Sequence, residues 1–85
     1  MARYSLRFKT SVAKDLRNLP KKDVRRILKR MESLADDARP SGCEKLVDSE
    51  IYRLRQGRYR ILYEIEDEVL VVLVIKVGGR DTVYR

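Results

Sequence analysis

The sequence predicts an α+β fold, in which an N-terminal strand and a helical hairpin precede a three-stranded antiparallel meander, with the helices packed on one face of a small sheet. Three patterns lead to this prediction. Residues 4–8 alternate apolar and polar side chains, residues 12–34 repeat apolar side chains at helical spacing, and residues 51–77 hold three strand-like runs. We expect residues 1–85 to form a single domain, because a chain of this length supports one core.

The N-terminal elements are predicted to be a strand and a short helix. The alternation in residues 4–8 is typical of a half-buried strand. In the helix that follows, Thr10 or Ser11 is the expected N-terminal cap, and Pro20 is expected to stop it. Its apolar face is predicted to consist of Val12, Leu16 and Leu19.

The second helix is predicted to run from Pro20 to Asp36-Asp37, where the carboxylates oppose the dipole of the helix at its C-terminal end. Its apolar stripe consists of Val24, Ile27, Leu28, Met31 and Leu34. Its other face is basic and carries Arg25, Arg26, Lys29 and Arg30. Charge on the outside of a helix is ordinary, so this face alone predicts no function.

A loop and three strands complete the predicted fold. Residues 38–42 are expected to form a loop, and residues 44–50 an irregular segment or a short strand. Strands are predicted over residues 51–55, 58–66 and 69–77, with a tight turn at Gln56-Gly57 and an acidic turn between the last two. The third strand is apolar on both faces, which predicts a central strand covered on both sides. Gly78-Gly79 is expected to break it, before a short tail.

Composition argues against several kinds of chemistry. The chain has no histidine, and Cys43, its only cysteine, is expected to be a reduced, unreactive thiol. Neither metal-ligand spacing nor a phosphate-cradling glycine loop is present, so we expect no metal and no cofactor. The N-terminus lacks an apolar signal segment, and the longest apolar run, Val69–Ile75, is too short to cross a bilayer. We therefore expect a cytoplasmic protein with no membrane partner.

Four arginines within eight residues are the main functional signal. Arg53 and Arg55 share one face of their strand, and Arg58 and Arg60 are expected to share the face opposite two predicted core tyrosines. The guanidinium fork suits phosphate, and a net charge of +7 favours an anionic partner, with nucleic acid as the first candidate. The alternative is that these are solvated charges paired with nearby glutamates, worth about 0–1 kcal/mol each.

Further residues extend this signal towards the C-terminus. Arg80 follows the central strand, whose end is expected to lie near Arg60. Tyr84 comes four residues later and is the tyrosine that packing explains least. Guanidinium groups beside a tyrosine can hold RNA, because they neutralise a phosphate while the ring stacks on a base.

The chain resembles the RelE/ParE superfamily of toxins from toxin–antitoxin systems, and most of all its RelE branch. The resemblance is carried by residues 52–63, the short acidic turn, residues 71–80 and Val83-Tyr84, and the N-terminal strand and helical hairpin fit as well. It implies a RelE-like fold and a ribosome-dependent endoribonuclease that cuts messenger RNA in the A site of the 70S ribosome. It also implies a cognate antitoxin, and binding to operator DNA only through that antitoxin.

The resemblance also implies roles for individual residues. Arg60 matches an arginine that contacts the scissile phosphate, Arg80 one that stabilises the transition state, and Tyr84 a tyrosine that stacks on or orients the nucleotide. Arg53 lies where the branch has a catalytic lysine, and Ile51 where it has another lysine. The residues expected to hold the RNA backbone are Arg55, Arg58 and Lys76.

Two other functions stay open. The same fold carries ParE-like proteins that poison DNA gyrase by binding, and the missing lysine and missing general base keep that alternative open. A toxin that has lost its chemistry and acts as an antitoxin-binding co-repressor is the second.

Overall fold

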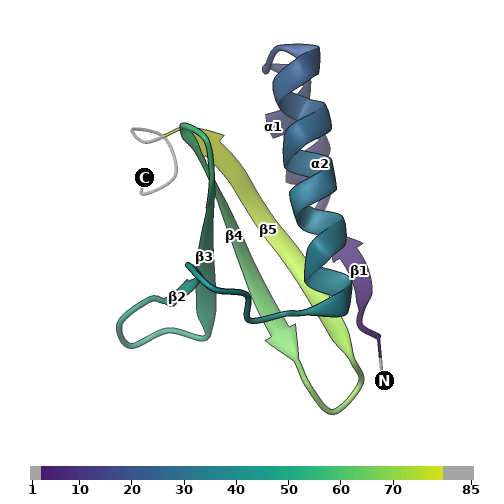
Figure 1. The fold of residues 1–85 in the computed structure, drawn as a ribbon, viewed down its shortest axis with the longest axis vertical. Coiled ribbons are helices and arrows are strands. Elements are labelled where there is room, and N and C mark those ends of the chain that lie inside the picture. Colours follow the sequence, from purple (N-terminus) through teal and green to yellow (C-terminus); the bar gives the residue numbers. More distant parts are fainter. Residues whose placement is uncertain (1–2, 80–85) are drawn as a thin grey trace.

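The computed structural model describes residues 3–79 and confirms the α+β class. Its elements are β1 (Ser5–Phe8), α1 (Thr10–Arg17), α2 (Lys21–Asp36), β2 (Glu44–Lys45), β3 (Ile51–Gln56), β4 (Tyr59–Glu66) and β5 (Val71–Gly79). The strands form one sheet in the order β1-β5-β4-β3-β2, in which only β1 and β5 are parallel (Figure 1). The predicted meander therefore has a neighbour on each side.

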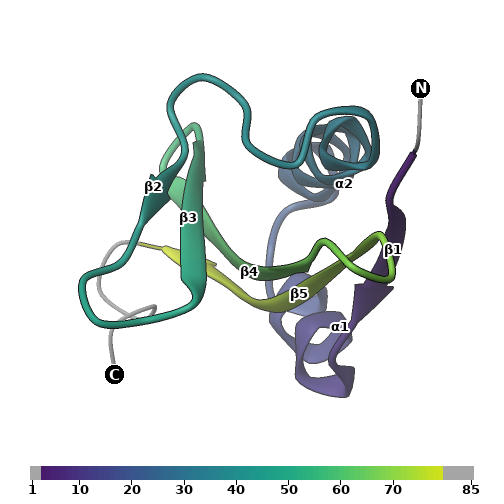
Figure 2. The same ribbon diagram turned by 90° about the horizontal axis from the view of Figure 1, so that it is seen from below.

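Both helices contribute to a single core on one face of the sheet. Val12 of α1 and Ile27, Met31 and Leu34 of α2 are buried in the same cluster as Tyr63 of β4. The strand residues in this cluster lie at matched register positions, so they point from one face. The sheet is strongly twisted, and β2 and β3 stand steeply to β4 and β5 in Figure 2. A bulge in β5, between the partners of Leu62 and Tyr63, adds to that twist.

The helices differ from the prediction at two points. The expected caps Thr10 and Ser11 are wrong, because Lys9 is the N-cap residue and makes no side-chain cap bond. Its backbone N–H still bonds to Val74 O at 3.0 Å, so the chain passes directly from the sheet into α1. In α2 three members of the apolar stripe are buried, whereas Val24 is partly buried and Leu28, at the solvent edge of the stripe, is 39% exposed.

The strand β5 is central, as predicted, but its limits are shifted. It begins at Val71 because Leu70 adopts a φ of 54° within the turn. Gly78-Gly79 does not break it, since both glycines pair with β4. The prediction that β5 is covered on both faces is confirmed for one face only, because Val71, Leu73 and Ile75 are only partly buried.

The sheet edges are short. β1 is mostly exposed, since only Leu6 is partly buried and Phe8 is 47% exposed, as expected of a strand at the edge of the sheet that residues 3–79 form. β2 is the short strand expected within residues 44–50 and covers the other edge. Among residues 3–79, neither helix combines the length and the apolar character that crossing a bilayer requires.

Candidate functional site

The sheet face that the helices leave uncovered, here called the open face, carries most of the predicted site. Strand pairing places Arg55, Arg60 and Gly78 side by side in one row of this face. The next row contains Arg53, Leu62 and Lys76. Four of the seven predicted site residues therefore come together within two adjacent rows.

Arg55 and Arg60 are directly opposite each other on neighbouring strands. Like charges in such a cross-strand pair are destabilising, by an amount comparable to the roughly 0.2–1 kcal/mol that favourable pairs contribute. Gly78, the partner of Arg60 on the other side, brings no side chain that could fill the space. An anion bound between the two guanidinium groups would remove their repulsion, so this row is a suitable phosphate site.

Arg53 has a carboxylate partner. Its Nη2 donates to Glu44 Oε2 of β2, its register partner, and the Arg53 side chain is 17% exposed. Next to it, Leu62 is 6% exposed although it lies on the open face. Its register partners on the two sides are Arg53 and Lys76, whose long alkyl stems are able to cover an apolar side chain while their charged tips stay in water.

Arg58 differs from the prediction, because it is not a strand residue, although it lines one hollow of about 340 Å³ together with Arg55 and Arg60. It is the second residue of the two-residue turn between β3 and β4, after Gly57, whose φ is 59°. Its guanidinium carbon lies 5.7 Å from the ring centroid of Tyr59, on the helix side. Tyr59 in turn donates a 2.7 Å hydrogen bond to Asp23 Oδ2, and that bond raises the pKa of the phenol.

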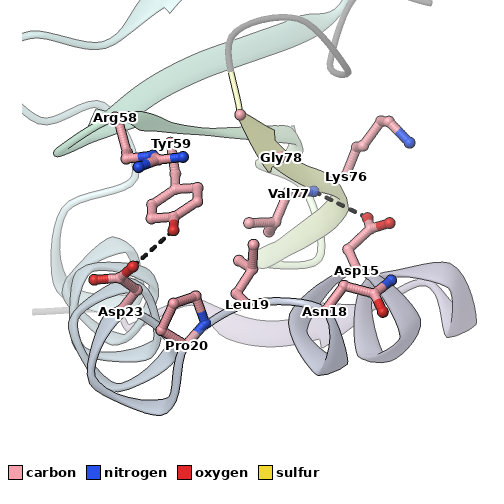
Figure 3. A pocket seen from close by; sticks show the side chains of 11 residues that line it. Asp15, Asn18, Leu19, Pro20, Asp23, Arg58, Tyr59, Lys76, Val77 and Gly78 are labelled. Carbon is pink, nitrogen blue, oxygen red and sulfur yellow. Dashed lines mark hydrogen bonds between the residues drawn. The ribbon is translucent and has the colours of Figure 1, made fainter.

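A cavity of about 580 Å³ lies on the helix side at the end of β5 (Figure 3). Two of its carboxylates already accept hydrogen bonds, Asp23 from Tyr59 and Asp15 from the backbone N–H of Val77 at 3.2 Å. Asp15 thus accepts a hydrogen bond from a backbone N–H of β5 that lies beyond the end of β1. Lys76 points away from the other labelled side chains. The cavity belongs to the join between helices and sheet, on the face opposite the arginine rows.

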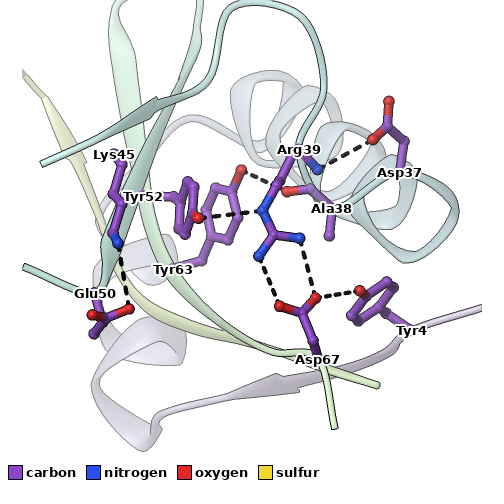
Figure 4. A network of polar contacts seen from close by, with 9 residues as sticks. All are labelled: Tyr4, Asp37, Ala38, Arg39, Lys45, Glu50, Tyr52, Tyr63 and Asp67. Carbon is purple, nitrogen blue, oxygen red and sulfur yellow. Dashed lines mark hydrogen bonds and ion pairs between the residues drawn. The ribbon is translucent and has the colours of Figure 1, made fainter. Parts of the chain in front are cut away.

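A polar cluster around Arg39 joins four parts of the chain (Figure 4). Its guanidinium donates to both Asp67 oxygens, at 3.1 and 2.9 Å, and to the Tyr52 hydroxyl at 3.2 Å. Tyr4 donates to the same carboxylate at 2.6 Å. The bond from Arg39, followed by that from Tyr4, lowers the pKa of Asp67 from 3.8 to about 2. This cluster connects the β4–β5 turn to the loop after α2, to β3 and to the residue before β1.

Two predicted residues, Arg80 and Tyr84, lie outside the described residues. The expected neighbourhood of Arg60 and the end of the central strand is confirmed, since Arg60 pairs with Gly78. Sequence reasoning missed Arg7, which pairs with Leu73 and so shares the open face. Its signal was the alternation of residues 4–8, which fixed the face of Arg7 but not the strand beside it.

Comparisons with known proteins agree with this geometry. Residues 6–84 match the model of a family described as the ParE toxin of the type II toxin–antitoxin system parDE. Toxin RelG of Mycobacterium tuberculosis is 31% identical over 86 residues, covering 96% of this chain and 97% of the relative.

Solved structures show the same fold. The RelE–RelB complex of Pyrococcus horikoshii contains a chain with a TM-score of 0.83 and 28% identity, covering 96% of this chain and 99% of that one. The E. coli RelBE toxin–antitoxin complex gives a TM-score of 0.77 and 30% identity, with coverage of 92% and 98%. The chain therefore belongs to the ParE toxin family of type II toxin–antitoxin systems, within the RelE/ParE superfamily and on its RelE-like side.

Proposed function

We propose that this chain is a ribosome-dependent endoribonuclease that cleaves messenger RNA in the ribosomal A site and so inhibits translation. The observation that carries this proposal is the row of Arg55 and Arg60 beside Gly78 on the open face. Two arginines paired across neighbouring strands place two guanidinium groups on one face, and each guanidinium can donate two parallel hydrogen bonds to a phosphate. The names of its relatives, RelE and RelG, support the same activity.

The proposed reaction is attack of a ribose 2′-hydroxyl on the adjacent phosphate, with no metal. Arg60 contacts the scissile phosphate, Arg80 stabilises the charge of the pentavalent transition state, and Tyr84 orients the nucleotide. Arg53 adds positive charge but stays protonated, so it is no general base. The protein therefore contributes electrostatic stabilisation and positioning, and the ribosome supplies the geometry of the substrate.

An antitoxin is the proposed protein partner. The two solved complexes above each pair a RelE chain with RelB, which supports a cognate antitoxin here. A small basic sheet with short edge strands suits an acidic segment that orders on binding. Such a segment neutralises the guanidinium groups directly, and operator DNA is reached only through it. All these partners are cytoplasmic.

Inhibition of DNA gyrase by binding is the second candidate. Two observations favour it: the matching family is named for ParE, and the lysine positions of the RelE branch hold Ile51 and an Arg53 already paired with Glu44. This function needs a surface and no cleavage chemistry.

Two assays on the same protein separate the candidates. Toe-printing on translating ribosomes reports cleavage, and supercoiling by gyrase reports the alternative. Arg60→Ala is expected to lower cleavage by about 100-fold or more, the usual effect of removing a group that stabilises transition-state charge. Arg17→Ala, an exposed arginine at the end of α1, serves as the control with unchanged cleavage. If the protein inhibited supercoiling by gyrase and produced no toe-prints on ribosomes, gyrase inhibition would be its function and the nuclease proposal would be wrong.

A further inference from the structure

A second group of cations lies on α2, away from the open face. This α2 basic row consists of Lys22, Arg25, Arg26, Lys29 and Arg30. All are exposed except Arg30, which is partly buried. The ion pairs found within residues 3–79 use the cations of Arg3, Arg39, Lys45 and Arg53, and none uses a member of the row.

The α2 basic row is unfavourable for the helix that carries it. Lys22 and Arg26, Arg25 and Lys29, and Arg26 and Arg30 are each four residues apart, so they lie about 6 Å apart along the axis. Like charges at this spacing destabilise a helix. Lys22, in the first turn of α2, also opposes the helix dipole. A bound polyanion would turn each of these penalties into an attraction.

Part of the row borders a groove. One hollow, of about 320 Å³, lies between α2 and the end of β3, and its walls are Arg26, Lys29, Arg30, Ser33 and Gln56. A second hollow, of about 230 Å³, adjoins it, because the two share Arg26 and Gln56. The second hollow continues to Arg58 in the β3–β4 turn. The groove thus runs along α2 towards the hairpin tip, with Asp23 as its one carboxylate.

The walls of the groove favour a nucleic-acid backbone over a protein segment. The larger hollow is lined by the side chains of three cations, a serine and a glutamine, so its polar groups are guanidinium, ammonium, hydroxyl and amide groups that suit phosphate and ribose. The apolar hollow on the helices is elsewhere, where α1 and α2 meet around Leu16 and Val24. The Ser33 hydroxyl donates to the backbone oxygen of Arg30, so it can only accept from a ribose 2′-hydroxyl, whereas the Gln56 amide can donate or accept. Contacts to this hydroxyl distinguish RNA from DNA.

We propose that the groove between α2 and the β3–β4 turn binds the phosphate backbone of a folded RNA, as an anchoring surface on the helix side that meets the open face only at Arg58. The anchoring residues are Arg26, Lys29, Arg30 and Arg58, with Ser33 and Gln56 against the ribose. Because this surface holds RNA without cutting it, it does not depend on the nuclease proposal.

The test measures the affinity of the full chain for a duplex RNA hairpin across a salt series. The variant Arg26→Gln/Lys29→Gln/Arg30→Gln removes three cations from the groove. The matched control Lys9→Gln/Lys14→Gln/Arg17→Gln removes three exposed cations from α1 and the residue before it. We expect the groove variant to lose about tenfold or more in affinity and about 2–3 in the salt slope, and the control to lose less than about threefold. Thermal unfolding checks that both variants fold.

Several outcomes would overturn the proposal. Equal losses in both variants would mean that RNA responds to net charge alone. Poly-glutamate serves as a second ligand that stands for an acidic protein segment. If the groove variant lost binding to poly-glutamate while its RNA binding stayed unchanged, the groove would be a protein-binding surface. In an Arg60→Ala background the groove variant is expected to cause the same loss, because distant sites act additively. If the groove variant caused no further loss of RNA affinity in the Arg60→Ala background, the groove and the open face would be parts of one binding site.

Discussion

At the scale of single residues, the best-defined interaction is the pair of Arg39 and Asp67. The sequence did not predict it, because the two residues are 28 positions apart and lie in a loop and a turn. An acidic turn was expected around Asp67, but no pattern indicates which carboxylate meets a guanidinium. The burial of Tyr59 and Tyr63 was predictable, since alternation within one strand fixes the face of each residue.

The lowered pKa of Asp67 makes this pair a measurable contributor to acid stability. Its pKa is about 2 in the folded chain, against a usual value of 3.8. The stabilisation is therefore fully present above about pH 4 and is lost as the pH falls through about 2. We expect Asp67→Asn to have a lower Tm than the parent chain at about pH 5, with the gap closing towards pH 2.

The control for this measurement is Asp36→Asn, which removes a carboxylate whose ion pair with Arg3 is more exposed. Its Tm is expected to follow that of the parent more closely, because exposed pairs contribute little. A gap for Asp67→Asn that stays constant with pH would contradict the proposed role of the carboxylate.

At the scale of elements, interiors were predictable and ends were not. The stripe of α2 follows from helical periodicity, and three of its five members are fully buried. The start of β5 depends on the left-handed backbone of Leu70, and its end depends on Gly78-Gly79 finding partners on β4. Two glycines in a row suggest a break when only local propensity is considered, but tertiary pairing overrides it here. The same pairing places Arg60 opposite Gly78, one residue before the end of β5.

The β3–β4 turn sets the register of the arginine rows and offers a test at this scale. Gly57 has a φ of 59°, and a Cβ built there would meet nothing within 4 Å. Any cost of Gly57→Ala is therefore a backbone cost, which we expect to lower the free energy of unfolding by about 1–2 kcal/mol. Urea denaturation measures it.

Gly79 provides the matched control. A Cβ at Gly79 also meets nothing within 4 Å, and its φ lies outside the left-handed region. Gly79→Ala is therefore expected to be neutral or slightly stabilising, as alanine loses less entropy on folding. Equal destabilisation in both variants would show that the turn conformation is not the cause.

At the scale of the whole molecule, charge and size act together. The chain has a net charge of +7, and the Cα atoms have a radius of gyration of 12.1 Å. The screening length is about 30 Å at 0.01 M salt and about 8 Å at 0.15 M, so cations throughout the molecule repel one another only in dilute salt. The sequence predicted this net charge but not its division between the open face and α2, because that division depends on which faces pack.

The response of stability to sodium chloride follows from this repulsion. We expect the Tm to rise by a few degrees between about 0.01 M and 0.15 M salt, since self-repulsion weakens while the exposed ion pairs contribute little. The variant Arg26→Gln/Lys29→Gln/Arg30→Gln has less repulsion to screen, so its Tm is expected to start higher and to rise less. A Tm that falls with salt would contradict this expectation, because it would mean that ion pairs such as Arg39–Asp67 contribute more to stability than the repulsion among the excess cations costs.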